Sequence, residues 1–178
     1  MWRTKQEEAY TERLEDHFSN SCGTVVEKLY NFPKFVPRQI LSQFLFKYEL
    51  MKLILPCHGS IVECGVHRGG GTMTFANISS ILEPYNYQRR IFGFDTFEGL
   101  VEVTEEDLTT DEGRKSAKTG AFKTMGPVED DLREAVELYD MNRPLGHVQK
   151  VYFIKGDATS TIRSFLDEHP ETVISLLY

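Results

Sequence analysis

Three groups of residues have types and positions that could bind a ligand, and each follows a short apolar run typical of a strand. The first is a glycine-rich turn after Glu63, the second is Asp95, and the third is Gly156-Asp157-Ala158. Glycines let a ligand approach the backbone closely, and free N–H groups at a helix start favour an anionic group. A carboxylate after the second strand can accept hydrogen bonds from both hydroxyls of a ribose. Asp157 could accept one from the exocyclic amine of a base, so the groups together predict a nucleoside-containing ligand.

The spacing of the turn excludes two common nucleotide motifs. The segment reads Glu63-x-Gly65-x-x-x-Gly69-Gly70-Gly71-Thr72. Two of its glycines stand four residues apart, which is not the dinucleotide pattern G-x-G-x-x-G, and no Gly-Lys-Ser/Thr follows as a Walker A loop requires. Each group also has a structural alternative. The glycines could form a tight turn without a ligand, Asp95 could be a turn or capping residue, and Asp157 could be the N-cap of the next helix.

The elements that must position these residues alternate along the chain. Apolar periodicity predicts a parallel sheet with right-handed crossovers and helices on both faces, the Rossmann-like form of the α/β class. The expected strands are residues 60–66, 90–95, 148–154 and 173–178, and the expected helices are 4–18, 37–55, 72–82, 127–139 and 159–168. Residues 19–34 read as a loop because of their breakers. A long acidic insertion at about residues 100–126 is typical of a functional or disordered segment.

Composition limits the classes of partner and site. The 178 residues carry a net charge of -7, which disfavours a nucleic-acid partner because phosphate binding needs a basic surface. No signal peptide and no bilayer-spanning run is visible. Three cysteines without regular spacing are typical of reduced thiols, so we expect a cytoplasmic protein, with Cys64 packed in the core. The histidines show no metal-ligand spacing, and a surface or turn position is expected for His67.

These residues resemble a known family. The run Ile61-Val62-Glu63-Cys64-Gly65-Val66-His67-Arg68-Gly69-Gly70, the run Phe92-Gly93-Phe94-Asp95-Thr96-Phe97-Glu98-Gly99-Leu100 and the triplet Gly156-Asp157-Ala158 are similar to the macrocin O-methyltransferase (TylF-like) family. Its members are class I methyltransferases that use S-adenosylmethionine. The resemblance covers about residues 35–178, so we expect residues 1–34 to form an N-terminal arm or helix. Residues 35–178 would then be the N-terminal part of a methyltransferase domain.

The resemblance implies roles for individual residues. Glu63, Gly65, Arg68 and Gly69 would surround the methionine part of the cofactor, and Asp95 would hold its ribose. Asp157 and Ala158 would flank the adenine, with Arg38 near the cofactor's carboxylate and the insertion 100–126 as a lid. The implied cofactor-binding set is Glu63, Gly65, Val66, Arg68, Gly69, Asp95, Thr96, Gly156, Asp157 and Ala158.

The family also carries an acidic D-x-D sequence directly after the fourth strand, which binds a divalent metal and supplies the base. That motif would begin after Tyr178, so catalytic residues and metal ligands stay unassigned here and Mg²⁺ is expected only with a further C-terminal part. The last six residues read as a strand that is apolar on both faces, and nothing follows to cover it. We therefore expect the fold to be incomplete at its C-terminus and the natural chain to be longer.

The acceptor implied by the family is a small molecule, in many members a sugar hydroxyl of a natural product, and a deoxysugar is one candidate. No membrane partner is expected, and a homodimer is possible because family members often pair through N-terminal helices. Two other readings stay open: a non-catalytic nucleoside-binding or scaffold protein, and an NAD-dependent oxidoreductase on a similar sheet.

Overall fold

The computed structural model describes residues 5–100, 110, 120–123 and 126–178. The chain forms two compact units, Met1–Phe46 and Lys47–Tyr178. The division falls inside a helix, whereas the boundary predicted from the sequence, at residue 34, stays a prediction. Most of the predicted insertion, residues 101–109, 111–119 and 124–125, lies outside the described residues, and so does its expected role as a lid.

The first unit is helical. It contains α1 (Lys5–Asn20), α2 (Val25–Tyr30), a 3₁₀ turn (Phe32–Lys34) and the first part of α3 (Arg38–Ile54). Phe35 is buried against the ring of Phe18, edge-on at 5.2 Å. Lys28 donates to the carbonyl of Phe18 at 2.6 Å, which satisfies a terminal carbonyl of α1. These contacts tie α2 and the 3₁₀ turn to the end of α1.

The prediction of a loop over residues 19–34 is wrong where α2 forms. Thr24 is its N-cap, and Glu27 completes a capping box because its carboxylate accepts from the Thr24 N–H at 2.7 Å. The breakers Asn20, Ser21 and Gly23 end one helix and lead into the next. The spacing Thr24-x-x-Glu27 is the sequence signature of a helix N-terminus. Here it has a stronger effect than the turn-forming residues that precede it.

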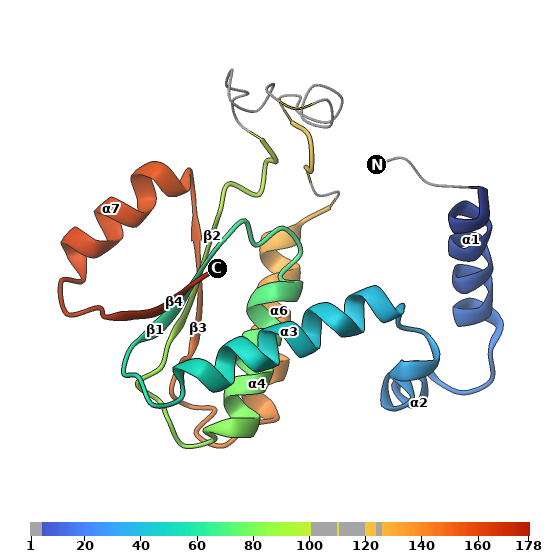
Figure 1. Ribbon diagram of the computed structural model, residues 1–178, viewed down its shortest axis with the longest axis horizontal. Helices are drawn as coiled ribbons and strands as arrows, with labels where there is room; N and C mark the ends of the chain where they lie inside the picture. Colours follow the sequence, from blue (N-terminus) through green and yellow to red (C-terminus); the bar gives the residue numbers. More distant parts are fainter. Residues whose placement is uncertain (1–4, 101–109, 111–119, 124–125) are drawn as a thin grey trace. The chain divides into compact units, whose positions relative to one another are not determined.

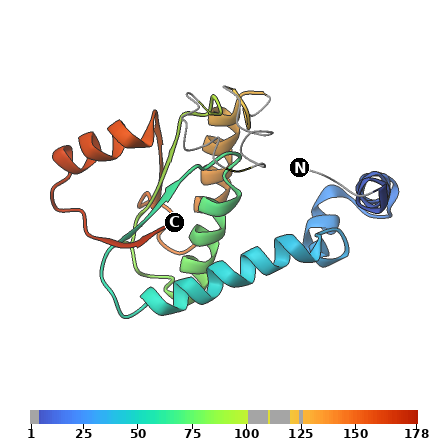
Figure 2. The ribbon, with the colours of Figure 1, turned by 45° about the horizontal axis from the view of Figure 1, so that its top comes forward.

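The second unit is built on a parallel sheet in the order β3-β2-β1-β4. Figures 1 and 2 show α7 (Ala158–Glu168) on one face of this sheet and α4 (Gly70–Leu82) with α6 (Val128–Met141) on the other. The strands are β1 (Ser60–Cys64), β2 (Ile91–Asp95), β3 (Val151–Lys155) and β4 (Ile174–Leu177). The predicted α/β fold with helices on both faces is therefore confirmed. Chain order reverses between β1 and β4, the kind of switch point at which ligands bind in such sheets.

Alternation along β1 divides the core between the two faces. Ile61 packs with Phe75 and Ile78 of α4 and with Met51 of α3, whereas Val62 lies on the opposite side. That opposite side is closed by Phe165 of α7, whose ring packs at a tilt against that of Phe92, with the ring centres 4.7 Å apart. The next residue on the α7 side, Cys64, is exposed, so its predicted core position is wrong. The reason is that α7 covers β2 and β3 and does not reach the end of β1.

The strands begin or end within three residues of their predicted limits. The largest difference is at β3, which begins at Val151 although the apolar pattern starts at Val148. Lys150, just before β3, is buried, and its side chain donates to the backbone carbonyl of a loop residue. This residue therefore makes a polar contact instead of continuing the apolar pattern of the strand. β4 forms one edge of the sheet, and its Leu177 side chain is 65% exposed. Among the described residues, no helix is both long and apolar enough to cross a membrane.

Arg89 joins the segments at the amino ends of the strands. Its side chain is fully buried and forms an ion pair with Glu83 at 2.6 Å, while Nη1 donates to Ser175 Oγ at 2.8 Å. The guanidinium also donates to three carbonyls, those of Ile54, Cys57 and Gly59. Because only a planar fork with five donors can make these bonds together, the end of α3, the start of β1 and β4 depend on one side chain.

We expect Arg89→Lys to destabilise the protein by about 3 kcal/mol, because lysine has fewer donors and several buried carbonyls lose their hydrogen bond. Urea unfolding followed by circular dichroism measures this. The neighbouring Arg90 is exposed, so Arg90→Lys is the matched control and should change stability by less than about 0.5 kcal/mol. Equal effects of the two substitutions would contradict the role assigned to Arg89.

Lys150 makes stability depend on pH. Burial lowers the pKa of Lys150 to about 8; Glu83 opposes this shift, and Arg143 and Arg89 add to it. Nζ donates to the carbonyl of Asn86 at 2.8 Å, so the side chain stays in place when it loses its proton. The unfolded chain keeps this proton until about pH 10.4, so between these pH values the unfolded state binds more protons and the folded state gains stability.

We therefore expect the stability of the wild type relative to Lys150→Met to rise between pH 8 and pH 10. Below pH 8 Lys150 is protonated in both the folded and the unfolded state. The difference in stability between the two proteins should therefore not change with pH there. Urea unfolding of both proteins from pH 6.5 to pH 10 checks this, and every other titrating group cancels in the difference. A difference that stays constant over the whole range would overturn the assigned pKa.

Candidate functional site

The carboxyl ends of β1, β2 and β3 surround a cavity of about 730 Å³. This size is typical of pockets for small molecules. Six of the ten residues predicted from the sequence line it: Gly65, Asp95, Thr96, Gly156, Asp157 and Ala158. The structure thus brings together the three groups that the sequence places after separate strands.

Asp95 connects the two turns that border this cavity. Its Oδ2 accepts from the backbone N–H of His67 and its Oδ1 from the N–H of Phe97, both at 2.7 Å. Both donor residues have positive φ, 54° and 57°. Residues other than glycine rarely adopt positive φ, so the carboxylate of Asp95 holds two strained turns in place. Each oxygen keeps a second lone pair that could accept from a ligand.

The turn between β1 and α4 is shaped by positive φ at alternating positions, Gly65 at 86°, His67 at 54° and Gly69 at 81°. Within this turn the N–H groups of Gly65 and Gly69 donate to the carbonyls of Phe94 and Val66, both at 2.9 Å, and that of His67 donates to Asp95. A Cβ added at Gly65 would meet no atom within 4 Å, so the backbone there faces open space in the cavity. Close approach of a ligand to the main chain is therefore possible at this residue.

Glu63 lies beneath the turn and is 4% exposed. Its Oε2 accepts a short hydrogen bond from the hydroxyl of Thr72, in the first turn of α4. Burial raises the pKa of Glu63, and the hydrogen bond from Thr72 and the charge of Lys47 oppose that shift. Glu63 does not line the cavity itself, so it supports the turn from below.

Asp157 performs the capping role that was left open and keeps one oxygen available. Its Oδ1 accepts from the N–H and the hydroxyl of Thr159, at 2.9 and 2.7 Å, which caps α7. These two bonds lower the pKa of Asp157, so its side chain is a carboxylate at neutral pH. The N-cap and ligand-binding interpretations are compatible, because Oδ2 takes no part in the cap.

Three further predicted residues, Val66, Arg68 and Gly69, do not line the cavity, and their binding roles stay predictions. Val66 is buried with Leu132 of α6, and a Cβ on Gly69 would collide with the same leucine. Arg68 is exposed. Thr96 does line the cavity, but its hydroxyl donates to the Gly99 carbonyl at 2.9 Å and so closes the turn. The part assigned to Arg38 concerns the other compact unit and stays a prediction.

Several lining residues were missed as site residues. The apolar wall comes from Phe97, Leu100 and Phe122, and His67 and Gly99 complete that side. Phe97, Gly99 and Leu100 belong to the run quoted for the family resemblance, which could have identified them. Phe122 lies far along the chain and is brought near because Leu100 and Ala121 are hydrogen-bonded through their backbones at 2.9 Å. That long-range pairing has no local sequence signal.

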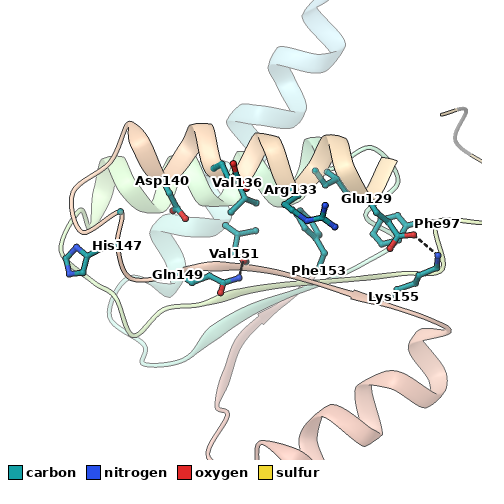
Figure 3. Close-up of a pocket in the computed structure, with 13 residues that line it drawn as sticks. Phe97, Glu129, Arg133, Val136, Asp140, His147, Gln149, Val151, Phe153 and Lys155 are labelled. Carbon is teal, nitrogen blue, oxygen red and sulfur yellow. Dashed lines mark hydrogen bonds and ion pairs between the residues drawn. The ribbon is translucent and has the colours of Figure 1, made fainter. Parts of the chain in front are cut away.

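A second hollow of about 440 Å³ lies between α6 and β3 (Figure 3). At one end Lys155 pairs with Glu129 at 2.5 Å, and Gln149 donates to the Val151 carbonyl at 3.1 Å. None of the residues predicted from the sequence to bind the cofactor lines this hollow. Among the residues that the structure describes, no group of three or more His, Cys, Asp or Glu side chains could hold a metal ion.

The comparison with known proteins decides the family. The sequence model of macrocin O-methyltransferase (TylF) matches residues 53–166. The chain belongs to the TylF family. Its fold is that of the class I methyltransferases, as a match to a solved member shows.

One matching crystal structure is that of CalS11, calicheamicin methyltransferase, at 33% identity and a TM-score of 0.92. An apo structure of CalS11, described as a TDP-rhamnose 3'-O-methyltransferase of calicheamicin biosynthesis, matches at 31% identity and a TM-score of 0.79. Both alignments cover 100% of this chain and 68% of the CalS11 chain. Among curated proteins none matches. As a TylF-family chain, it comes from a family of S-adenosylmethionine-dependent O-methyltransferases.

Two adjacent glycines at the start of α4 offer a matched test of the turn. A Cβ on Gly71 would collide with Oε1 of Glu63, whereas one on Gly70 meets nothing within 4 Å. We expect Gly71→Ala to displace Glu63, to destabilise the fold by about 1–3 kcal/mol and to weaken binding of S-adenosylmethionine. Gly70→Ala should be neutral or stabilising by up to about 1 kcal/mol, because alanine favours a helix. Urea unfolding and calorimetry measure both effects, and a Gly71→Ala protein as stable as the Gly70→Ala protein would contradict the packing described.

Proposed function

We propose that this protein is an S-adenosylmethionine-dependent O-methyltransferase that methylates a sugar hydroxyl of a natural product or a related small molecule. The observation that carries the proposal is the convergence of Asp95, the glycine turn and Asp157 on one cavity at the strand tips. Family membership supports the reaction class. The acceptor is proposed from CalS11, which is a TDP-rhamnose 3'-O-methyltransferase and so acts on a deoxysugar.

The chemistry of the cavity fits this cofactor. The ribose hydroxyls would donate to Asp95, whose oxygens keep a lone pair each beside the bonds from His67 and Phe97. The adenine would lie against the apolar wall with its amine toward Oδ2 of Asp157. The methionine part would lie over the turn that begins at Gly65, where the backbone faces open space in the cavity. Glu63 would supply a negative charge below the cationic end.

The roles proposed for the chain's own residues are binding and orientation. When bound, S-adenosylmethionine supplies an electrophilic methyl group on a sulfonium, so the protein has to align a hydroxyl with it. Asp95 and the glycine turn fix the direction of the cofactor, and the wall of Phe97, Leu100 and Phe122 excludes water from one side. A divalent metal ion with a general base would supply activation of the hydroxyl, and among the residues that the structure describes none is assigned to hold such an ion.

Two alternatives make different demands on the cavity. A non-catalytic nucleoside-binding or scaffold protein would bind the cofactor without transferring its methyl group. An NAD-dependent oxidoreductase would bind a dinucleotide, against which the Gly65-to-Gly69 spacing speaks. A cytoplasmic location and a homodimer remain predictions from the sequence and the family.

Binding and transfer assays test the proposal. Calorimetry with S-adenosylmethionine, S-adenosylhomocysteine and NAD should detect the first two ligands only. Incubation of the full-length protein with methyl-labelled cofactor, Mg²⁺ and TDP-linked deoxysugars should label a hydroxyl. Binding without labelling of any acceptor would favour the scaffold alternative, and binding of NAD alone would favour the oxidoreductase.

The role of Asp95 gives a sharper expectation. Asp95→Asn should weaken binding of S-adenosylhomocysteine by about tenfold to a hundredfold, since the amide nitrogen cannot accept from a ribose hydroxyl or from a backbone N–H. Asp167→Asn is the control, because Asp167 is exposed on α7 and changes the net charge equally. Equal affinities of the two variants, measured by calorimetry, would remove Asp95 from the proposed site.

A further inference from the structure

A buried lysine lies close to the proposed cofactor site without belonging to it. Lys47, on α3, is 7% exposed, and its Nζ donates to the hydroxyl of Tyr178 at 3.0 Å. The ammonium also lies 4.3 Å from the centre of the Tyr178 ring and 5.9 Å from that of Phe75. Two aromatic faces and one hydroxyl thus hold a cation that has little contact with water.

The position of this lysine is set by the sheet. Tyr178 follows β4 and is paired with β1 on both sides: its N–H donates to the Val62 carbonyl at 2.9 Å, and its carbonyl accepts from Cys64 at 3.0 Å. Its side chain is therefore placed beside Glu63 at the point where the strand order reverses between β1 and β4. Tyr178 holds Lys47 at the same end of the sheet as the glycine turn.

Through Tyr178, which is paired with β1 on either side of Glu63, the charge of Lys47 is brought near enough to act on Glu63. Glu63 is itself 4% exposed and bonded to Thr72 of α4, while Asp95 of β2 and the Cys64 thiol are the other titratable groups that act on it or respond to it. Asp95 carries the same charge as Glu63, so of these groups only Lys47 stabilises the carboxylate by its charge. A buried carboxylate without an opposite charge nearby would tend to keep its proton.

We propose that Lys47, held by Tyr178 and Phe75, is a positioning residue that keeps Glu63 charged beneath the glycine turn, so that the site is ready for the cationic end of S-adenosylmethionine. This inference rests on the proposed function. Lys47 has no role in the sequence-based assignment of the site. It acts through Glu63 and does not touch the cofactor.

The inference predicts a change in pH dependence. Without Lys47 the pKa of Glu63 rises further, so the pH below which cofactor binding declines should move up by about one unit. Below that pH, Lys47→Met should bind about tenfold more weakly than the wild type, and at pH 9 the two should bind equally. Lys47→Arg should restore most of the wild-type profile. Lys52→Met is the matched control, because Lys52 is exposed on the same helix, and it should change nothing.

The experiment is calorimetric titration of S-adenosylmethionine from pH 5 to pH 9 with each variant, alone and combined with Glu63→Gln. In the Glu63→Gln background, Lys47→Met should have no further effect on the pH profile. Circular dichroism checks folding, and Lys47→Gln replaces Lys47→Met if the latter unfolds. A Lys47→Met profile that is lower than the wild type by the same factor at every pH would overturn the inference, because a merely structural role predicts that result.

A second readout works without the cofactor. Infrared difference spectra between each protein and its Glu63→Gln counterpart follow the titration of the Glu63 carboxyl in the unliganded protein. The midpoint should rise in Lys47→Met and stay in place in Lys52→Met, and an unchanged midpoint in Lys47→Met overturns the role of Lys47. Failure of the wild type to bind the cofactor at any pH overturns the proposed function instead, so the two failures are distinguishable.

Discussion

The hydrogen bonds from two backbone N–H groups to Asp95 are the constraint on which the cavity depends. His67 and Phe97 lie in turns after different strands, and both have left-handed backbones that cost about 1 kcal/mol or more each. One carboxylate holds both turns, so the shape of the pocket and its ability to receive a ribose come from the same side chain. A site built this way is organised before the ligand arrives, which reduces the entropy lost on binding.

Buried charges at the two ends of the sheet serve different purposes. At the amino ends, Arg89 pairs with Glu83 and donates to the surrounding carbonyls, so the charge of Arg89 has a purely structural role. At the carboxyl ends, Glu63 is bonded to Thr72 and is influenced by the charge of Lys47, which is a smaller set of partners than that of Arg89. Burial raises the pKa of Glu63, which gives that end of the sheet an electrostatic state that a ligand or a change of pH can alter.

The sequence was sufficient for much of the fold and for part of the site. The apolar runs gave the four strands because buried parallel strands have a composition of their own, and Asp95 and Asp157 could be placed because each directly follows such a run. The helix at Val25–Tyr30 was missed because its turn-forming neighbours dominated the local composition. The motif did not reveal that the Val66 side chain packs against Leu132, because the direction of a side chain after a strand ends has no fixed period, and the binding role of Val66 stays a prediction. Phe122 and Lys47 could not be found from the sequence, since each reaches the site through a contact with a distant part of the chain.

The most direct test of the central claim is a crystal structure of the protein soaked with S-adenosylhomocysteine. The account predicts the ribose hydroxyls within hydrogen-bond distance of Asp95, the adenine amine at Oδ2 of Asp157, and the amino-acid end over the turn that begins at Gly65. Binding of the ligand in the hollow between α6 and β3, or in the strand-tip cavity with its ribose turned away from Asp95, would contradict it.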